Sequence, residues 1–491
     1  MSTEAYFERF RQGIVGHDHD FETPYGRKQL IYADWIASGR LYGPIEDKLH
    51  GTFGPWVGNT HSESSVTGTS MTRAYHEARH IIKRHVNAGP NDVIIATGSG
   101  MTGVINKLQR ILGLRIPEPL MPHVNVPESE RPVILLTHME HHSNQTSWLE
   151  TIADVHWLEP MPNGECCMKT LREAVKQYEG RRLIGSFTAC SNVTGVRTPY
   201  HEMARIMHEA GGLCFVDFAA SAPYDPIDMH PEDEAARLDA VFFSPHKFLG
   251  GPGSAGIMVF DSALDPNHVP DEPGGGTVDW TNPWGEHRFV SNIEDREDGG
   301  TPAFLQTIRA ALCIKLKEEI TCDAIHVREK ELLDRAFEGL GEIPGLVILA
   351  EHLRDRLGVI SFYFEGIHYN LVVKLLNDRF GIQVRGGCSC AGTYGHYLLH
   401  VDPEHSHRIT DRINEGDLSE KPGWVRLSLH PTMTDAELEI VIDALAAVRA
   451  NITEWEKDYR YDPNTNEYVH REERALPVEE WFSLEREGAA L

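Results

Sequence analysis

The chain has 491 residues, enough for two or three domains, and its 46 lysines and arginines against 73 aspartates and glutamates give a formal charge of -27. This charge repels phosphate backbones and anionic lipids, so we discount nucleic acid and membranes as main partners. The sequence contains no apolar run near the roughly 18 residues of a membrane span and no signal-peptide pattern, which predicts a soluble, cytoplasmic protein. We expect its eight cysteines to be free thiols, because that compartment is reducing.

The predicted elements divide the chain into four parts. Residues 1–40 are mixed and polar, and we assign them to a smaller domain. In residues 41–315 the helical pattern of "MTRAYHEARHIIKRHV" alternates with apolar runs such as "DVIIATGSG", "RPVILLTHMEHHSN", "GGLCFVDFAAS" and "LDAVFFSPHK". Such runs predict a large α/β domain around a mostly parallel sheet covered on both faces. Residues 316–450 read as a smaller α+β domain, and 451–491 as a charged, aromatic extension without assigned chemistry.

Polar residues collect at the ends of these predicted strands, where open α/β sheets bind ligands. Gly100, Met101 and Thr102 follow one strand and open a helix, whose free amides suit a phosphate. The same residues also suit an ordinary strand-to-helix turn. Asp217 and Lys247 each end an apolar strand, where a buried charge needs a partner. Pyridoxal phosphate satisfies all three sites, because its phosphate, protonated ring nitrogen and aldehyde would meet the helix start, Asp217 and Lys247.

Seven short motifs carry a family resemblance. They are "MEHHSN", "CSNVTG", "FVDFAAS", "FFSPHKFLGGPGSAGIM", "GGTP", "RGGCSCAG" and "WVRLSLHPTMTDAEL", in this order. Over residues 30–450 the sequence resembles the class V, fold type I pyridoxal phosphate enzymes, and within them the cysteine desulfurases and selenocysteine lyases. The resemblance implies a homodimer in which the large domain has a seven-stranded, mostly parallel sheet.

The resemblance also implies roles for individual residues. His141 would stack on the cofactor ring and act in catalysis, and Asn192 would contact the phenolate side of the ring or the substrate. Arg426 would clamp the substrate carboxylate, a task that suits a planar bidentate donor. A structural histidine at a strand end and a surface ion pair for the arginine are the alternatives. The other implied cofactor ligands are Gly100, Met101, Thr102, Ser244 and His246, with Thr301 reaching into the partner subunit's site.

One position departs from the desulfurase pattern. Desulfurases usually carry Asp-x-x-Gln or Asp-x-x-His on the strand of Asp217, whereas here the sequence reads "DFAA" and the last place is Ala220. Cofactor binding is unaffected in principle. The departure leaves room for another class V reaction on a different amino acid, such as an aminotransferase, an epimerase or a C–S lyase, including one like the molybdenum-cofactor sulfurases.

The stretch "RGGCSCAG" suggests the reaction. Its two thiols lie beside Arg385 in a glycine-rich loop, where cationic surroundings favour thiolate. Aligned on the family's spacing, Cys390 is the nucleophile and Cys388 an extra thiol. We therefore expect Lys247 to remove the Cα proton and Cys390 to take sulfur or selenium as a persulfide, releasing alanine, with a possible sulfur-acceptor protein as partner.

A noncatalytic metal protein is the third hypothesis. Cys388, Cys390, His396 and His400 together have the ligand types of a tetrahedral zinc site. The C-x-C spacing is tighter than the usual C-x₂₋₄-C, so we expect no metal.

Overall fold

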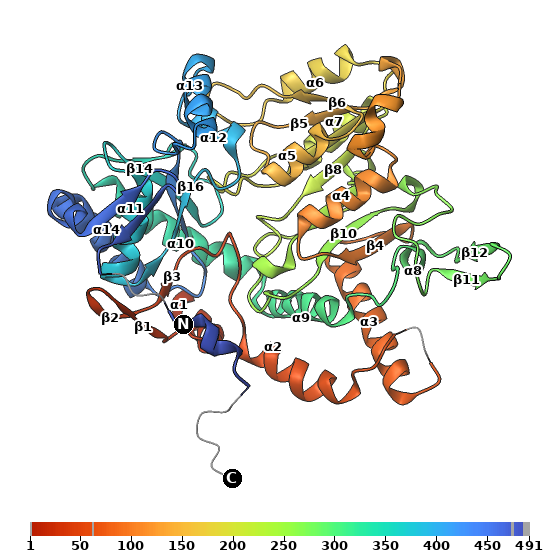
Figure 1. Ribbon diagram of the computed structural model, residues 1–491, viewed down its shortest axis with the longest axis horizontal. Coiled ribbons are helices and arrows are strands. Elements are labelled where there is room, and N and C mark those ends of the chain that lie inside the picture. Colours follow the sequence, from red (N-terminus) through yellow and green to blue (C-terminus); the bar gives the residue numbers. More distant parts are fainter. Residues whose placement is uncertain (1, 61–62, 473–475, 485–491) are drawn as a thin grey trace, which may run out of the picture.

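The computed structural model describes residues 2–60, 63–472 and 476–484, and its centre is a seven-stranded sheet (Figure 1). The strands from β6 through β5, β7 and β8 to β9 run parallel, and β10 pairs antiparallel with both β9 and β4. The predicted mostly parallel seven-stranded sheet is therefore confirmed. In sheet order the strands are β4 (Asp92–Thr97), β10 (Gly256–Asp261), β9 (Ala240–Phe243), β8 (Leu213–Asp217), β7 (Leu183–Thr188), β5 (Val133–Leu136) and β6 (Asp154–Trp157).

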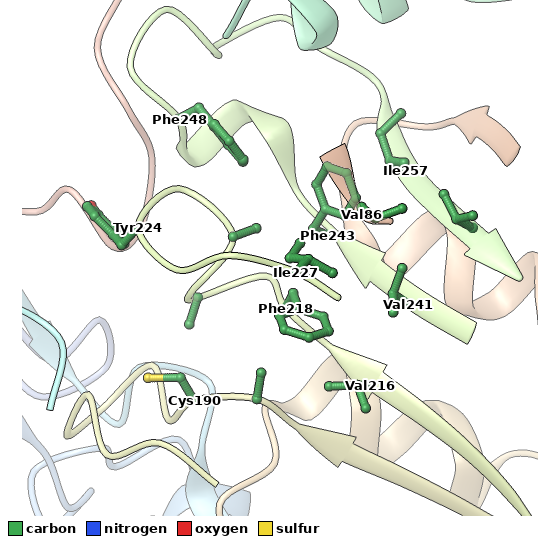
Figure 2. Packing of buried hydrophobic residues seen from close by; sticks show 14 of the residues in the cluster. Val86, Cys190, Val216, Phe218, Tyr224, Ile227, Val241, Phe243, Phe248 and Ile257 are labelled. Atoms are coloured by element: carbon green, nitrogen blue, oxygen red, sulfur yellow. The ribbon is translucent and has the colours of Figure 1, made fainter. Parts of the chain in front are cut away.

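Helices cover both faces of this sheet, which is why its strands are apolar without interruption. Successive side chains alternate between the faces: Ile94 and Val216 lie in one buried cluster, and Ile95 and Phe215 lie in another. Figure 2 shows part of the first cluster, with Val216 and other side chains projecting from neighbouring strands. The first face packs on α3 (Val66–His85), α6 (Met168–Gln177), α7 (Tyr200–Glu209) and α9 (Phe304–Ile320), and the second on α4 (Met101–Ile111) and α5 (His142–Leu149).

A second, separate core lies around a four-stranded antiparallel sheet. Part of the N-terminal segment joins this unit, because β3 (Ile31–Tyr32) pairs in parallel with β15 (Ile382–Gln383). Phe7 and Phe10 of α1 (Thr3–Arg11) instead pack in the first core. The four strands are β13 (Leu346–Ile348), β14 (Val359–Phe364), β17 (Trp424–Ser428) and β16 (Arg385–Gly387), and the helices that belong to this unit are α10 (Cys322–Gly341), α11 (Tyr369–Leu375) and α14 (Asp435–Trp455).

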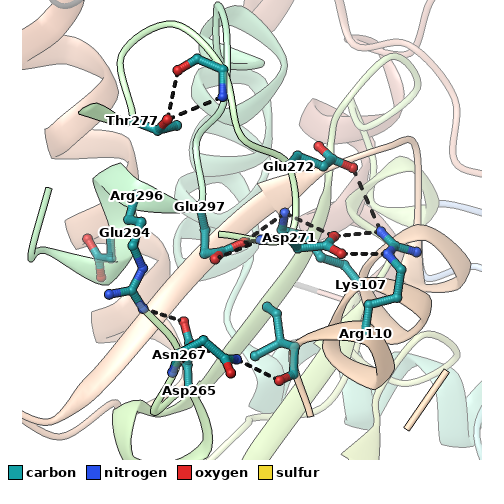
Figure 3. Close-up of polar contacts among 12 residues, drawn as sticks. Lys107, Arg110, Asp265, Asn267, Asp271, Glu272, Thr277, Glu294, Arg296 and Glu297 are labelled. Atoms are coloured by element: carbon teal, nitrogen blue, oxygen red, sulfur yellow. Dashed lines mark hydrogen bonds and ion pairs between the residues drawn. The ribbon is translucent and has the colours of Figure 1, made fainter. Parts of the chain in front are cut away.

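An inserted arm, β11 (Val278–Thr281) and β12 (His287–Phe289), projects beside α8 (Ile293–Arg296) and is anchored at its base by buried charges (Figures 1 and 3). Lys107 Nζ lies 3.0 Å from Glu297 Oε2 and 3.4 Å from Asp271 Oδ2, and both the lysine and Glu297 side chains are 1% exposed. Buried charges are tolerated only when paired in this way. The ion cluster therefore fixes the two ends of the insertion to α4.

The C-terminal extension, which shows no period in the sequence, forms a hairpin of β18 (Tyr459–Asp462) and β19 (Glu467–His470) on the smaller unit. The remaining elements are β1 (Asp20–Thr23), β2 (Gly26–Gln29), α2 (Gly43–Lys48), α12 (Gly392–Leu398) and α13 (Pro403–Asn414). Across the described residues, none of the helices combines the length and apolarity needed to cross a bilayer.

Candidate functional site

The start of α4 forms a cradle lined by backbone amides and hydroxyl groups. Gly98 turns the chain with φ +61°, Gly100 precedes the helix without a side-chain cap, and Met101 N donates to Ser244 Oγ at 2.8 Å. A Cβ atom on Gly256 would overlap the Gly100 carbonyl, so the backbone is packed too tightly there for a side chain. Thr102 Oγ1 lies 2.6 Å from Ser143 Oγ at the start of α5. Two helix N-termini and several hydroxyls thus meet, an arrangement that fits a phosphate.

Asp217 ends β8 and is 3% exposed. Its Oδ1 accepts a hydrogen bond from Ala219 N at 2.8 Å. Burial raises the pKa of this carboxyl to about 6, although the Ala219 amide and the charge of Lys247 oppose the shift. A cationic ring nitrogen beside Asp217 would supply the counter-charge that the buried carboxylate lacks.

Lys247 follows β9 in a short 3₁₀ turn, Pro245–Lys247. Burial lowers the pKa of its amine to about 8, with Arg426 and Arg385 lowering it further and Asp217 and Asp34 opposing them. Near pH 7 an amine with such a pKa is still mostly protonated, but its neutral fraction, on the order of a tenth, is far larger than that of an ordinary lysine, and this neutral form is both a nucleophile and a base.

The N-terminal segment packs against the residues on either side of this lysine, His246 and Phe248. Gly39 N donates to the carbonyl of His246 at 2.9 Å, and Ser38 Oγ lies 3.5 Å from His246 Nδ1. A Cβ atom on Gly39 would overlap the Phe248 carbonyl, so the contact requires glycine. Burial lowers the pKa of His246 to about 4, which keeps its imidazole neutral.

His141 precedes α5, and its Nδ1 accepts from Ser143 N at 3.1 Å. Burial and then the neighbouring Lys247 lower its pKa to about 3, so the ring is neutral with its proton on Nε2. The preceding residue, Glu140, is 1% exposed and accepts from Thr137, Thr188 N and Asn144 Nδ2. This carboxyl, which the sequence analysis passed over, fixes the backbone from which the neutral ring projects.

Arg426 lies on β17 and is 2% exposed. It shares the carboxylate of Asp34 with Arg385, and the sequence analysis did not identify Asp34. Arg426 Nη2 lies 2.9 Å from Asp34 Oδ1, and Arg385 Nε lies 3.1 Å from Asp34 Oδ2. Arg426 Nη1 also donates to the carbonyl of Asn192 at 3.2 Å. In the part of the chain that is described, the buried polar atoms without a hydrogen-bond partner include Arg426 Nε and Asn192 Oδ1. Unsatisfied buried groups are rare in folded proteins, and these fit an absent polar ligand.

The cysteine loop crosses from the smaller unit to the larger one. It leaves β16 through Gly387 at φ +107°, and Ser389 and Cys390 follow at φ +52° and +55°. Asn192 Nδ2 donates to Ser389 O at 2.8 Å, and His142 N donates to Cys390 O at 2.8 Å. His142 is a further residue that the motif comparison did not single out.

The structure distinguishes the two thiols of this loop. Cys390 is exposed. Cys388 is half-buried and packs against the apolar cluster that contains Met139, Tyr394 and Trp424. The exposed thiol is thus available for chemistry, whereas the other is part of the packing.

The four residues of the zinc hypothesis are not arranged as a metal site. His396 has both ring nitrogens engaged, with Nδ1 2.7 Å from Gly392 O and Nε2 2.8 Å from Ser406 Oγ. Among the residues described, no three side chains of cysteine, histidine, aspartate or glutamate gather as metal ligands. The zinc hypothesis therefore has no support from the geometry.

Two other positions lie as follows. Thr301 is exposed, and its Oγ1 lies 3.5 Å from Asn59 Oδ1, so its predicted role in a partner's site stays a prediction. Ala220, where the motif departs from the desulfurases, is 5% exposed and packs in the first core.

The chain was compared with known proteins. Residues 31–441 match the aminotransferase class-V family. A probable cysteine desulfurase of Halalkalibacterium halodurans is 29% identical over 370 residues, 74% of this chain and 84% of that one, and a probable cysteine desulfurase of Staphylococcus epidermidis is 29% identical over 374 residues, 75% and 85% of the two chains.

Solved structures share the fold. The apo structure of a cysteine desulfurase from Thermococcus onnurineus superposes with a TM-score of 0.71 at 22% identity, over 90% of this chain and 98% of that chain. The cysteine desulfurase CsdA of Escherichia coli gives 0.69 at 21% identity, over 92% and 99%. Together with the family match, the site and the fold lead to one assignment: the chain belongs to the class-V aminotransferases and is a pyridoxal phosphate-dependent enzyme of fold type I.

Proposed function

We propose that this enzyme is a cysteine desulfurase that moves sulfur from L-cysteine, or selenium from selenocysteine, onto Cys390 and releases alanine. The observation that carries the proposal is the loop geometry: an exposed thiol lies on a loop that Asn192 and His142 hold by hydrogen bonds, near the buried Arg426. The desulfurase names of the relatives agree with it. We further propose that the enzyme is a cytoplasmic homodimer that passes its sulfur to an acceptor protein.

The residues present would hold pyridoxal phosphate as follows. The start of α4 at Gly100, Met101 and Thr102, with the side chains of Ser244 and His246, would bind its phosphate, and the Met101 amide would hold the Ser244 hydroxyl in place. Asp217 would pair with the ring nitrogen, and the neutral His141 would lie on the ring face. When bound, the cofactor supplies an electron sink for negative charge at the substrate Cα.

The substrate carboxylate would bind Arg426, whose guanidinium offers two parallel N–H groups and has an unsatisfied Nε. Asn192 Oδ1, also unsatisfied, would accept from the substrate or the cofactor. Held in this way, the substrate presents its Cα proton to Lys247, whose neutral amine removes it.

Cys390 would then act as the nucleophile. Its sulfur forms an S–S bond with the substrate sulfur while the substrate Cβ–S bond breaks, and the electron pair of that bond stays with the carbon fragment. The proton released by the Cys390 thiol passes to the Cβ of this fragment, and Lys247 returns the proton that it removed to Cα, so that the fragment leaves as alanine. Cys390 is left as a persulfide, from which an acceptor thiol takes the outer sulfur.

The test is mass spectrometry of the cofactor-loaded enzyme after incubation with cysteine and alkylation. The proposal predicts one added sulfur on the peptide that contains Cys390, with an equal amount of alanine. Cys390→Ser should abolish both, while Cys388→Ser, the matched control in the same loop, should keep both. Absence of alanine and of persulfide in the unaltered enzyme would overturn the proposal.

A second candidate has an observation in its favour. Because Ala220 packs in the apolar core, the side chain that desulfurases usually carry there is absent from this site. Another class V reaction, such as transamination, epimerisation or C–S cleavage of a larger amino acid, would be favoured if cysteine were inert but other amino acids changed the absorbance of the loaded enzyme.

A further inference from the structure

The turn of the C-terminal hairpin, between β18 and β19, contains a buried asparagine. Asn466 is 7% exposed and has φ +60°. Its Nδ2 donates to the Tyr369 hydroxyl at 2.6 Å, and its Oδ1 accepts from the Tyr461 hydroxyl at 2.8 Å. His368 Nε2 lies 3.0 Å from the same Oδ1, and Asn370 Nδ2 donates to the backbone carbonyl of Asn466 at 2.5 Å. One side chain thus ties the hairpin turn to the first residues of α11.

The hairpin itself is firmly attached to the smaller unit. Just before β18, Asp458 accepts from Arg379 Nη2 at 2.9 Å and from the Tyr25 hydroxyl at 2.7 Å. At the other end of β18, the carbonyl of Pro463 accepts from Leu418 N at 2.9 Å. The turn that carries Asn466 is therefore held from both sides, and it can act as a fixed support.

The residues that Asn466 binds lie directly behind the strand that leads into the cysteine loop. A Cβ atom on Gly386 of β16 would overlap Asn370 Oδ1 and lie 3.1 Å from Tyr369 Cδ2. A Cβ atom on Gly423 would lie 2.6 Å from Tyr369 Cε1 and 2.9 Å from Gly387 Cα. Tyr369 and Asn370 are thus wedged against β16, two residues before the first thiol.

The cysteine loop needs such support because its backbone is strained. Ser389 and Cys390 both have positive φ, a conformation that is unfavourable for a non-glycine residue and persists only when neighbours enforce it. On the side of the larger unit, Asn192 and His142 hold the loop by hydrogen bonds. On the side of the smaller unit, the support comes from β17 and from Tyr369 and Asn370.

We propose that Asn466 is a positioning residue for Cys390, and that the C-terminal hairpin is part of the apparatus that presents this thiol. By fixing Tyr369 and Asn370 against β16, Asn466 keeps the loop in the conformation in which Cys390 is held over the site. The inference rests on the proposed function in that Cys390 is the nucleophile.

The test measures the reactivity of Cys390 in the cofactor-loaded enzyme. Iodoacetamide alkylation of the Cys390 peptide is followed by mass spectrometry, with Cys167 as the internal reference. Asn466→Ala should change the alkylation rate of Cys390 by about fivefold, the factor that corresponds to one lost hydrogen bond. It should also slow persulfide formation in a single turnover while leaving the KM for cysteine and the cofactor absorbance unchanged. Asn464→Ala, at an exposed position of the same turn, is the matched control and should match the unaltered enzyme.

The outcomes separate this inference from the proposed function. If persulfide forms in no variant but the alkylation rates differ as expected, the desulfurase proposal fails and the positioning role stands. If Asn466→Ala and Asn464→Ala give the same alkylation and persulfide rates, the positioning role is wrong. Should Asn466→Ala fail to fold, Tyr369→Phe removes only the hydroxyl that Asn466 binds and must show the same change, or the inference falls.

Discussion

Replacing Asp34 by asparagine tests how the substrate arginine is held. The carboxylate of Asp34 is the charged partner of both Arg426, at 2.9 Å, and Arg385, at 3.1 Å. A hydrogen bond to a charged group contributes about 1.5–3 kcal/mol, a value that applies to the buried Arg426. The Arg385 side chain is 51% exposed, so solvent screens its bond to less than about 1 kcal/mol.

Asp34→Asn should therefore destabilise the protein by about 2–3 kcal/mol, which lowers the melting temperature by roughly 2–3 °C in a chain of this size. Because the substrate carboxylate would no longer compete with Asp34 for Arg426, the KM for cysteine should fall at the same time. Differential scanning calorimetry and steady-state kinetics measure the two effects, with the exposed Asp47→Asn as control. A melting temperature equal to that of the control would refute the electrostatic role of Asp34.

Two further predictions concern lysines. Since burial lowers the pKa of Lys247 to about 8, capture of pyridoxal phosphate by the cofactor-free protein should speed up with pH as the ammonium loses its proton and level off above about 8; an absorbance-monitored rate that still climbed at pH 10 would point to an ordinary lysine instead. Lys107→Met leaves Glu297 as an uncompensated buried charge at the base of the inserted arm, whereas Asp271 keeps its ion pair with Arg110, and the change should cost about 3–5 kcal/mol. Thermal unfolding against Lys169→Met, whose side chain is 82% exposed, measures it, and equal melting temperatures would contradict the importance of the cluster.

The sheet could be predicted from the sequence because its strands are buried on both faces. A strand such as Ala240–Phe243 is apolar at every position, and a polar residue ends the run where the strand leaves the core. The rule that ligands bind at the carboxyl ends of such strands then pointed to Asp217 and Lys247 without any knowledge of three-dimensional contacts.

Contacts between distant segments could not be predicted in this way. Asp34 and Arg426 are 392 positions apart, and nothing local in "YADWIAS" indicates that its aspartate faces an arginine. The C-terminal hairpin was missed for a different reason. Its aromatic side chains pack against His368, which precedes α11, and against Tyr25, so its strands show no simple alternation of their own. The different environments of Cys388 and Cys390 likewise depend on Trp424 and Tyr394, which pack behind only one of the two thiols.

The cysteine loop is covalently part of one unit but hydrogen-bonded to the other, and this arrangement links access to reactivity. Asn192 and His142 donate hydrogen bonds to the backbone carbonyls of Ser389 and Cys390 across the boundary between the units. A hinge motion between the units could widen the entrance for an amino acid or for a sulfur-acceptor protein. Such a motion would have to break these two hydrogen bonds and move the thiol away from the larger unit. Substrate entry and nucleophilic attack by Cys390 would then be successive events, controlled by the hydrogen bonds between the cysteine loop and the larger unit.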